Sequence, residues 1–170
     1  LSATLVQSPS TPVILPGCIA GESLLSQIIV DKFLYHLPEY RQAKRFKELG
    51  VEISTSSINR WVHAMADKLY GLYAAQMERV LSASYIQVDE TTHPITDRPG
   101  SARKGYIWVV RSVLVPGVFF YYDKGSRSGE VVLKMLKGYQ GALQTDGYAA
   151  YSIFEEKKGV LPLGCMAHVR

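Results

Sequence analysis

The stretch "YIQVDETTHPI", residues 85–95, governs the fold that the sequence predicts. Polar and apolar side chains alternate from Tyr85 to Val88, which is the period of a strand with one buried face. Two adjacent carboxylates, Asp89 and Glu90, follow directly. Carboxylates at the C-terminal end of a strand either solvate a turn or hold a cation. The stretch alone leaves both interpretations open, so the choice depends on the elements around it.

Two more strand-like runs follow this stretch, and proline and glycine residues between the runs mark short connections. The three runs predict an antiparallel meander, and helical and strand-like patterns alternate after it. The order βββαβαβ is the opening order of the ribonuclease H-like fold, an α/β fold in which helices flank a mixed sheet. The expected elements are the strands "YIQVDETT" (85–92), "KGYIWVVRS" (104–112) and "GVFFYYDKGS" (117–126), a helix in "SGEVVLKMLKGY" (128–139) capped by Ser128, a strand in "GALQTDG" (141–147), a short helix in "YAAYSIFEEKKG" (148–159) and a strand in "VLPLGCMAHV" (160–169).

Two aspartates fall at strand ends in this topology. The first strand is expected at the centre of the sheet with the fourth beside it in parallel, so Asp89 and Asp146, in "QTDGY", should lie side by side. Two carboxylates on rigid strand ends are suitable ligands for a divalent cation, Mg²⁺ or Mn²⁺. An aspartate before glycine is also a common turn residue. The placement of both acids at one sheet edge favours a metal site over two unrelated turns.

The other polar residues near these strand ends have more ordinary interpretations. His93 is expected in a turn with Pro94 between the first two strands, and Glu90 and Asp123 are expected in solvent. His168, on the last strand, is a candidate auxiliary ligand or phosphate contact, and a hydrogen-bonded histidine at a strand end is the alternative. The aromatic residues of the meander are assigned to packing of the sheet.

The chain before residue 83 shows helical patterns instead of strand-like ones. Prolines and glycines in residues 1–22 predict a linker, and residues 23–82 predict a helical segment. The expected helices are one that starts at Ser23 and stops before Pro38, one in "EYRQAKRFKEL" (39–49) that ends at Gly50, and a long one from Ser54 or Thr55 to about Leu81.

A short helix, a glycine turn and a capped helix bearing "TSSINRW" form the outline of a helix-turn-helix. In that interpretation Lys44, Arg45, Lys47 and Arg60 form a DNA-binding surface. In the alternative they belong to the solvated face of a small helical bundle, with Trp61 in its core. The pattern does not distinguish the two interpretations.

Composition indicates the class of protein. Of the 170 residues, 47% are hydrophobic and 20% are charged, as in a soluble globular protein, and the net charge of +4 suits a polyanionic partner. No apolar run is long enough to cross a bilayer, and the first residues lack a signal-peptide pattern, so the cytoplasm is the expected compartment. Cys18 and Cys165 form no C-x-x-C pair and are interpreted as buried thiols, not as a disulfide or a zinc site.

Several blocks are specific enough to compare with a known family. They are "VDETTHPI", "KGYIWVVRS", "FYYDKGSRSGEVVLKML", "GYQGALQTDGYAAY" and "GVLPLGCMAHVR", preceded by "GCIAGESLLSQIIVDKFLYHLPEYRQAKRF" through "GVEISTSSINRWV". In this order they resemble the catalytic core, and the helical region before it, of the insertion sequence 66 family of bacterial DDE transposases. The resemblance implies a cut-and-join transposase with a ribonuclease H-like core, dependence on Mg²⁺, DNA as the partner, and a triad of two Asp and one Glu. The two aspartates of that triad match Asp89 and Asp146.

The resemblance also implies that part of the triad is missing from this chain. The third acid of the family lies on a helix beyond the "AH-x-R" block, so residues 83–170 are expected to be a catalytic core truncated before that acid. Glu130 lies where ribonuclease H carries a carboxylate and is a candidate auxiliary ligand. We therefore expect a transposase fragment that forms a homo-oligomer on DNA and is inactive alone. The alternatives are a non-catalytic DNA-binding or oligomerising fragment and a ribonuclease H-like nuclease.

Overall fold

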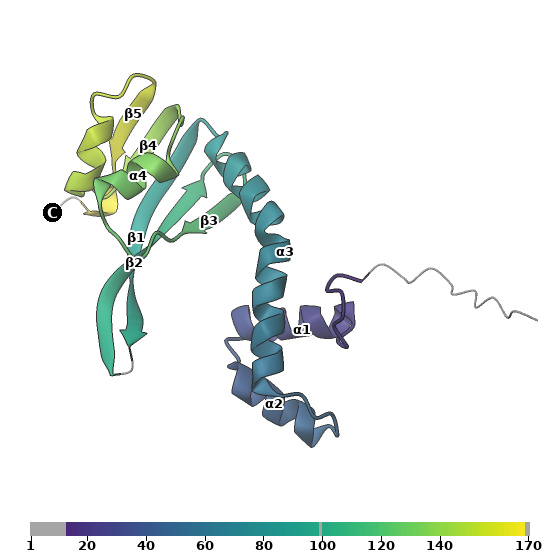
Figure 1. Ribbon diagram of the computed structural model, residues 1–170. Coiled ribbons are helices and arrows are strands. Elements are labelled where there is room, and N and C mark those ends of the chain that lie inside the picture. The colour runs from purple at the N-terminus through teal and green to yellow at the C-terminus, as the bar shows by residue number, and fades with distance from the viewer. Residues whose placement is uncertain (1–12, 99, 169–170) are drawn as a thin grey trace, which may run out of the picture. The chain divides into compact units, whose positions relative to one another are not determined.

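The computed structural model describes residues 13–98 and 100–168 (Figure 1). The chain forms two compact units, which divide between Tyr70 and Gly71 inside one long helix. The first unit is helical, and the second combines helices with a five-stranded mixed sheet. Each unit has its own buried core.

The helical unit contains α1 (Glu22–Phe33), α2 (Glu39–Glu48) and the first part of α3 (Thr55–Leu81). Gly50 follows α2 with a φ of +83°, as expected for the left-handed residue that ends a helix. Ser54 caps α3, because its Oγ accepts a hydrogen bond of 3.1 Å from the backbone N–H of Ser57. The prediction of Ser23 as the cap of α1 is wrong. Gly21 occupies that position, since glycine is also tolerated at a helix N-cap.

Buried side chains from all three helices form the core of the helical unit. Trp61 is one of them, as the bundle interpretation expects. Gln42 is also fully buried, and its Nε2 donates hydrogen bonds to the carbonyl oxygens of Ile28 (3.3 Å) and Leu37 (3.0 Å). This amide therefore joins α2 to α1 and to the end of the segment between them. The largest apolar members of the core are Leu25, Ile28, Phe46, Ile58, Trp61, Val62 and Met65.

An ion pair between Asp31 and Arg45 also connects α1 to α2. The side chain of Asp31 is 4% exposed and accepts a second hydrogen bond, of 2.8 Å, from Nε2 of Gln27. Arg45 is 40% exposed, and its guanidinium lies 5.3 Å from the ring centroid of Phe46. The Arg45 guanidinium therefore compensates a buried carboxylate while the arginine stays partly in solvent.

The sheet unit has the strand order β3-β2-β1-β4-β5. The pairs β1–β2 and β2–β3 are antiparallel and the pair β1–β4 is parallel, as the sequence predicts. The last strand, β5, pairs with β4 in parallel. The protein is therefore a mixed α/β protein with the first strand at the centre of the sheet. The elements are β1 (Tyr85–Arg98), β2 (Ser101–Ser112), β3 (Gly117–Tyr121), α4 (Gly129–Met135), β4 (Gly141–Thr145), the 3₁₀ helix η1 (Ala149–Phe154), β5 (Val160–Gly164) and the 3₁₀ helix η2 (Met166–His168).

The hairpin of β1 and β2 extends well beyond the rest of the sheet as a two-stranded arm (Figure 1). His93 and Pro94 lie inside β1, opposite Gly105 and Lys104, so the prediction of a turn at these residues is wrong. Beyond Gln87 the strand has no partner on its β4 side, and a proline without an N–H is tolerated there because no hydrogen bond is lost.

The core of the sheet unit lies on the face that α4 covers. Val132 and Leu136, from α4 and its C-cap, are fully buried together with Trp108 from β2. The Nε1 of Trp108 also donates a hydrogen bond of 3.1 Å to the carbonyl oxygen of Ser126. Ser128 occupies the N-cap position of α4 as predicted, but its side chain makes no capping hydrogen bond.

The start of β4 requires glycine. Gly141 has a φ of +137°, and a Cβ at this position would lie 2.5 Å from the carbonyl oxygen of Ser84. The carbonyl of Ser84 also accepts a hydrogen bond of 2.8 Å from the N–H of Ala142, so the backbone of β4 lies in direct contact with the residue before β1.

Two smaller expectations concern the cysteines and the membrane. Both Cys18 and Cys165 are free thiols, although each is only half-buried. Within the described residues no helix combines the length and the apolar character that spanning a membrane would need.

Replacing Arg45 with Gln should destabilise the helical unit, because the buried carboxylate of Asp31 then loses its cationic partner. Breaking a buried pair costs about 3 to 5 kcal/mol, and we expect about 2 kcal/mol here because Arg45 remains partly in water. Lys44→Gln, on the same helix, removes an exposed charge and should change the free energy of unfolding by less than about 0.5 kcal/mol. Urea denaturation followed by circular dichroism measures both, and equal losses would contradict the assignment.

Candidate active site

Asp89 lies in the middle of β1, where the parallel pairing with β4 stops. Gln87 is the last residue of β1 that pairs with β4, opposite Gln144, whereas the pairing with β2 continues to Arg98. The prediction that Asp89 ends its strand is therefore wrong, because the hairpin with β2 keeps the backbone extended beyond it. Asp146 directly follows β4, as predicted.

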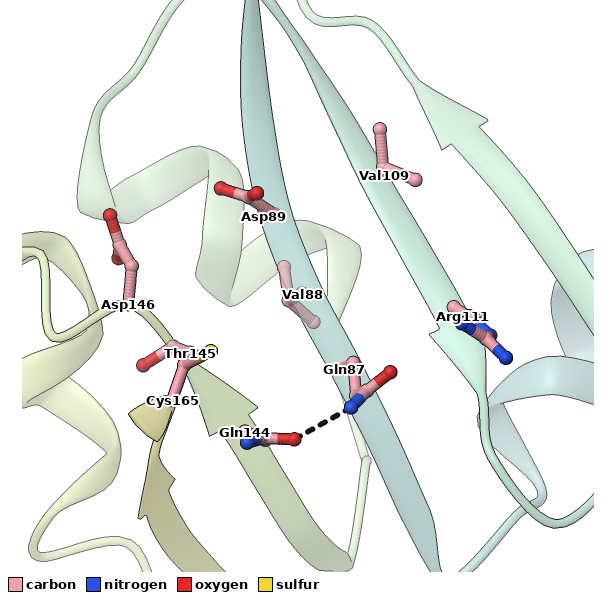
Figure 2. Close-up of a pocket in the computed structure, with 9 residues that line it drawn as sticks. All are labelled: Gln87, Val88, Asp89, Val109, Arg111, Gln144, Thr145, Asp146 and Cys165. Atoms are coloured by element: carbon pink, nitrogen blue, oxygen red, sulfur yellow. Dashed lines mark hydrogen bonds between the residues drawn. The ribbon is translucent and has the colours of Figure 1, made fainter. Parts of the chain in front are cut away.

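The two aspartates nevertheless line one pocket of about 250 Å³. Figure 2 shows both carboxylates at one end of this pocket, Asp89 on β1 and Asp146 on the loop that follows β4. The sequence-based expectation that these acids come together is therefore met by the geometry, while their chemical role stays a prediction. The pocket is lined by Gln87, Val88, Asp89, Val109, Arg111, Gln144, Thr145, Asp146 and Cys165.

Each aspartate is oriented by a backbone N–H close to it in the chain. Oδ1 of Asp89 accepts the N–H of Glu90 at 2.9 Å, and Oδ1 of Asp146 accepts the N–H of Tyr148 at 2.9 Å. Among the residues that the structure describes, no basic side chain forms an ion pair with either carboxylate. Both acids therefore keep acceptor capacity for a ligand in the pocket.

A row of polar side chains continues from the acids along the same face of the sheet. Oε1 of Gln144 accepts hydrogen bonds from the hydroxyl of Tyr85 (2.6 Å) and from Nε2 of Gln87 (2.7 Å). Arg111, on β2, lies opposite Gln87 and is exposed in the pocket. Arg111 is not among the site residues predicted from the sequence. The signal was the alternation of β2, which places Arg111 on the same face as Val109.

Glu90 lies on the buried face of the sheet, so the prediction that it is solvated is wrong. Its side chain is 1% exposed and forms an ion pair with Arg127, whose Nε donates at 2.6 Å. The hydroxyl of Tyr151 donates to the other carboxylate oxygen at 3.0 Å. Burial, reinforced by the negative charge of Glu90, raises the pKa of Tyr151 above its ordinary value, so this hydroxyl stays protonated. The sequence did carry a signal for this burial, because residues two apart in a strand share a face and Glu90 follows the buried Val88 by two.

Two other acids considered in the sequence, Asp123 and Glu130, do not line this pocket, and His168 lies at the edge of the described residues. Asp123 is not simply solvated, because its carboxylate accepts a hydrogen bond of 2.9 Å from Nζ of Lys134. Glu130 is exposed in the first turn of α4 and is not among the residues that line the pocket. The prediction that His168 lies on the last strand is wrong, because β5 ends at Gly164 and His168 ends the 3₁₀ helix η2; its side chain lies outside the described residues.

The predicted DNA-binding residues of the helical unit fall into two groups. Lys44, Lys47 and Arg60 are exposed, and Nη2 of Arg60 donates to Oγ of Ser57 at 3.3 Å. Arg45 is instead the partner of Asp31 described above. Three of the four predicted residues therefore present charge to solvent, and the fourth has a contact that stabilises the unit.

The donor set of the pocket fits a hard divalent cation. Mg²⁺ is commonly held by one or two carboxylates and keeps several waters, and Asp89 and Asp146 supply two such carboxylates at one pocket. Among residues 13–98 and 100–168 no cluster of three His, Cys, Asp or Glu side chains could hold a metal ion. Asp89 and Asp146 are therefore the two candidate ligands that the described residues place at this pocket.

Comparison with known proteins identifies the family. The model of the Transposase IS66 family matches residues 17–170. Uncharacterized protein y4qI of Sinorhizobium fredii (strain NBRC 101917 / NGR234) is 30% identical over 182 aligned positions, which cover 98% of this chain and 33% of that protein. Uncharacterized protein y4hP of the same organism is 32% identical over 174 positions, which cover 96% and 31%. This chain spans about a third of the length of these relatives, and because the family model matches it from residue 17 to its last residue, the chain belongs to the IS66 transposase family.

Proposed function

We propose that this chain is the catalytic-core part of a transposase that cuts DNA and joins the strands during transposition of an insertion sequence. The observation that carries the proposal is that Asp89 and Asp146, which are remote in the sequence, line one pocket. Membership of the IS66 transposase family supports a transposase role. We further propose that the sheet is of the ribonuclease H-like type, supported by its strand order and its mixture of antiparallel and parallel pairs.

The proposed chemistry is phosphoryl transfer at a site with two metal ions. Mg²⁺ or Mn²⁺ at Asp89 and Asp146 would activate a water or a 3′-hydroxyl and stabilise the oxygen that leaves the phosphodiester. In this chain the backbone N–H groups of Glu90 and Tyr148 orient the two carboxylates. The guanidinium of Arg111, exposed in the same pocket, is suited to bind a phosphate oxygen of the DNA strand.

The proposal includes residues that this chain does not contain. Because the described residues provide two clustered acids and no third, we propose that the third carboxylate of the triad comes from another part of the full-length transposase. Glu130 stays a candidate auxiliary ligand only if the loop before α4 rearranges, since it does not line the pocket now. A homo-oligomer on DNA is part of the same proposal.

The helical unit is proposed to contact the DNA backbone. Lys44, Lys47 and Arg60 are exposed cations, and cations that contact phosphates release counterions when DNA binds. Arg45 is left out of this surface because it compensates Asp31.

A non-catalytic role of this chain, as a DNA-binding or oligomerising fragment, is the second candidate. The lack of a third clustered acid among the described residues is the observation that favours it for the chain in isolation. Metal binding and cleavage, tested separately, distinguish the two functions.

Calorimetry should detect weak binding of Mn²⁺ to the wild-type chain, because two carboxylates leave most of the coordination to water. Asp89→Asn and Asp146→Asn should each remove the binding heat. Asp67→Asn, which changes an exposed acid of α3 in the helical unit, should retain it and serves as the matched control. Identical heats from all four proteins would remove the proposed site.

Binding to duplex DNA should weaken steeply as salt is added. Replacing Lys44, Lys47 and Arg60 with Gln should flatten the negative slope of log affinity against log salt, reducing its magnitude by up to about 3, since each lost phosphate contact removes about 0.9. Neutralising Lys137, Lys157 and Lys158, on the sheet unit, removes the same charge as a control. If both triple variants change the slope equally, the helical surface has no special role.

The full-length transposase that contains this chain should cleave a labelled insertion-sequence end in the presence of Mg²⁺. Asp146→Asn should reduce cleavage to background, because a catalytic acid and metal ligand is lost, and circular dichroism should show an unchanged fold. The 170-residue chain alone should bind DNA without cutting it. Cleavage by a folded Asp146→Asn protein at the wild-type rate would overturn the assignment of the site.

A further inference from the structure

Arg127 contacts both segments that carry the proposed catalytic aspartates. Its guanidinium forms the ion pair with Glu90, the neighbour of Asp89 on β1. The central carbon of this guanidinium lies 3.7 Å from the ring centroid of Tyr148, which is two residues after Asp146. One planar cation therefore holds a side chain from β1 and a side chain from the loop after β4.

The residues that Arg127 holds are also those whose backbone orients the two acids. The N–H of Glu90 donates to Asp89, and the N–H of Tyr148 donates to Asp146, each at 2.9 Å. A shift of either backbone would move the carboxylate that it holds. The distance between the two carboxylates thus depends on how firmly Glu90 and Tyr148 are joined.

We propose that Arg127 is a positioning residue that fixes Asp89 and Asp146 relative to each other by holding Glu90 and Tyr148 on its guanidinium. The inference rests on the proposed function, because it assigns Arg127 a role in preparing the metal site. Arg127 is not among the residues that line the pocket, so it acts through the backbone and not by touching the cation.

The surroundings of the cluster explain why the link is firm. Glu90 is 1% exposed, and both of its carboxylate oxygens have partners, Arg127 on one and Tyr151 on the other. The Tyr151 ring meets the rings of Trp108 and Tyr148 edge to face, with centroids 6.1 Å and 6.4 Å apart. A buried, fully paired carboxylate has few alternative positions, so the guanidinium above it is held in one place.

Arginine is the side chain that this arrangement requires. Nε and Nη2 of Arg127 both donate to Oε1 of Glu90, while the guanidinium carbon lies over the ring of Tyr148. Lysine would supply charge without the fork or the flat face. Partners of metal ligands commonly change metal affinity by 10- to 100-fold when they are removed, which sets the scale expected here.

The test compares three variants with a matched control in the 170-residue chain. Arg127→Met removes the link but leaves Glu90 buried without its cation. Tyr148→Leu removes the stacked ring without stranding a charge, so it keeps the proposal testable if Arg127→Met does not fold. Tyr148→Phe preserves the aromatic ring and should keep the Mn²⁺ affinity and the amide exchange of the wild type. The control, Arg103→Met, removes the arginine that pairs with Asp97 on the hairpin arm.

Two measurements are made on each folded protein. Mn²⁺ affinity, by calorimetry, should fall about 10-fold or more in Arg127→Met and Tyr148→Leu, and should be unchanged in Tyr148→Phe and Arg103→Met. Amide exchange by nuclear magnetic resonance should be about tenfold faster or more at Tyr148 in the same two variants, while the amide of Val110 in the core keeps its protection. A general loss of stability would instead accelerate both amides.

The outcomes separate this inference from the proposed function. If the wild type binds Mn²⁺, and Arg127→Met and Tyr148→Leu bind it equally well, the positioning role is wrong while the metal site stands. If the wild type binds no Mn²⁺, the proposed metal site is wrong. In that case the rate of amide exchange at Tyr148 alone decides whether Arg127 holds the loop after β4. Unchanged exchange at Tyr148 in both variants overturns the inference in either case.

Discussion

Three residue pairs join β1 to β4 in parallel: Tyr85 with Ala142, Ile86 with Leu143, and Gln87 with Gln144. The site depends on this short ladder, because it is what brings Asp89 and the residue after β4 to one pocket. Its start is fixed by Gly141, where any larger side chain would meet the carbonyl of Ser84. Its end leaves β1 free to continue with β2 alone, and the acid at that point is exposed on one face instead of being covered by a neighbouring strand.

The second constraint is electrostatic. A carboxylate with 1% exposure is costly to bury unless its partners are well placed, and Glu90 has Arg127 and Tyr151. A buried ion pair is weak evidence of stability, since an apolar replacement of the same shape can be as stable. What the pair does provide is a specific connection. Arg127 binds Glu90, next to Asp89 on β1, and its guanidinium also lies over the ring of Tyr148, on the loop that follows Asp146.

Neighbouring charges in this chain repeatedly serve different purposes, and backbone periodicity is the reason. Asp89 and Glu90 are consecutive, yet the twofold period of a strand puts one in an open pocket and the other in the core. Lys44 and Arg45 are also consecutive, and the period of a helix leaves the first exposed while the second compensates a buried carboxylate of α1. Residue type alone therefore does not identify which cations of a basic segment are available to DNA.

The sequence by itself determined the order of the elements, because strand alternation and turn residues are local signals. The parallel placement of the first and fourth strands, and with it the meeting of Asp89 and Asp146, followed from the topology that this order implies. It failed at the length of the hairpin, where His93 and Pro94 read as a turn, since a proline gives the same signal in a turn and in an unpartnered strand edge. It also failed for Glu90, which looks like an ordinary surface acid. Only the tertiary structure decided that case, because the partners of Glu90 come from the segment before α4 and from η1, and no local pattern records which distant side chains will compensate a buried charge.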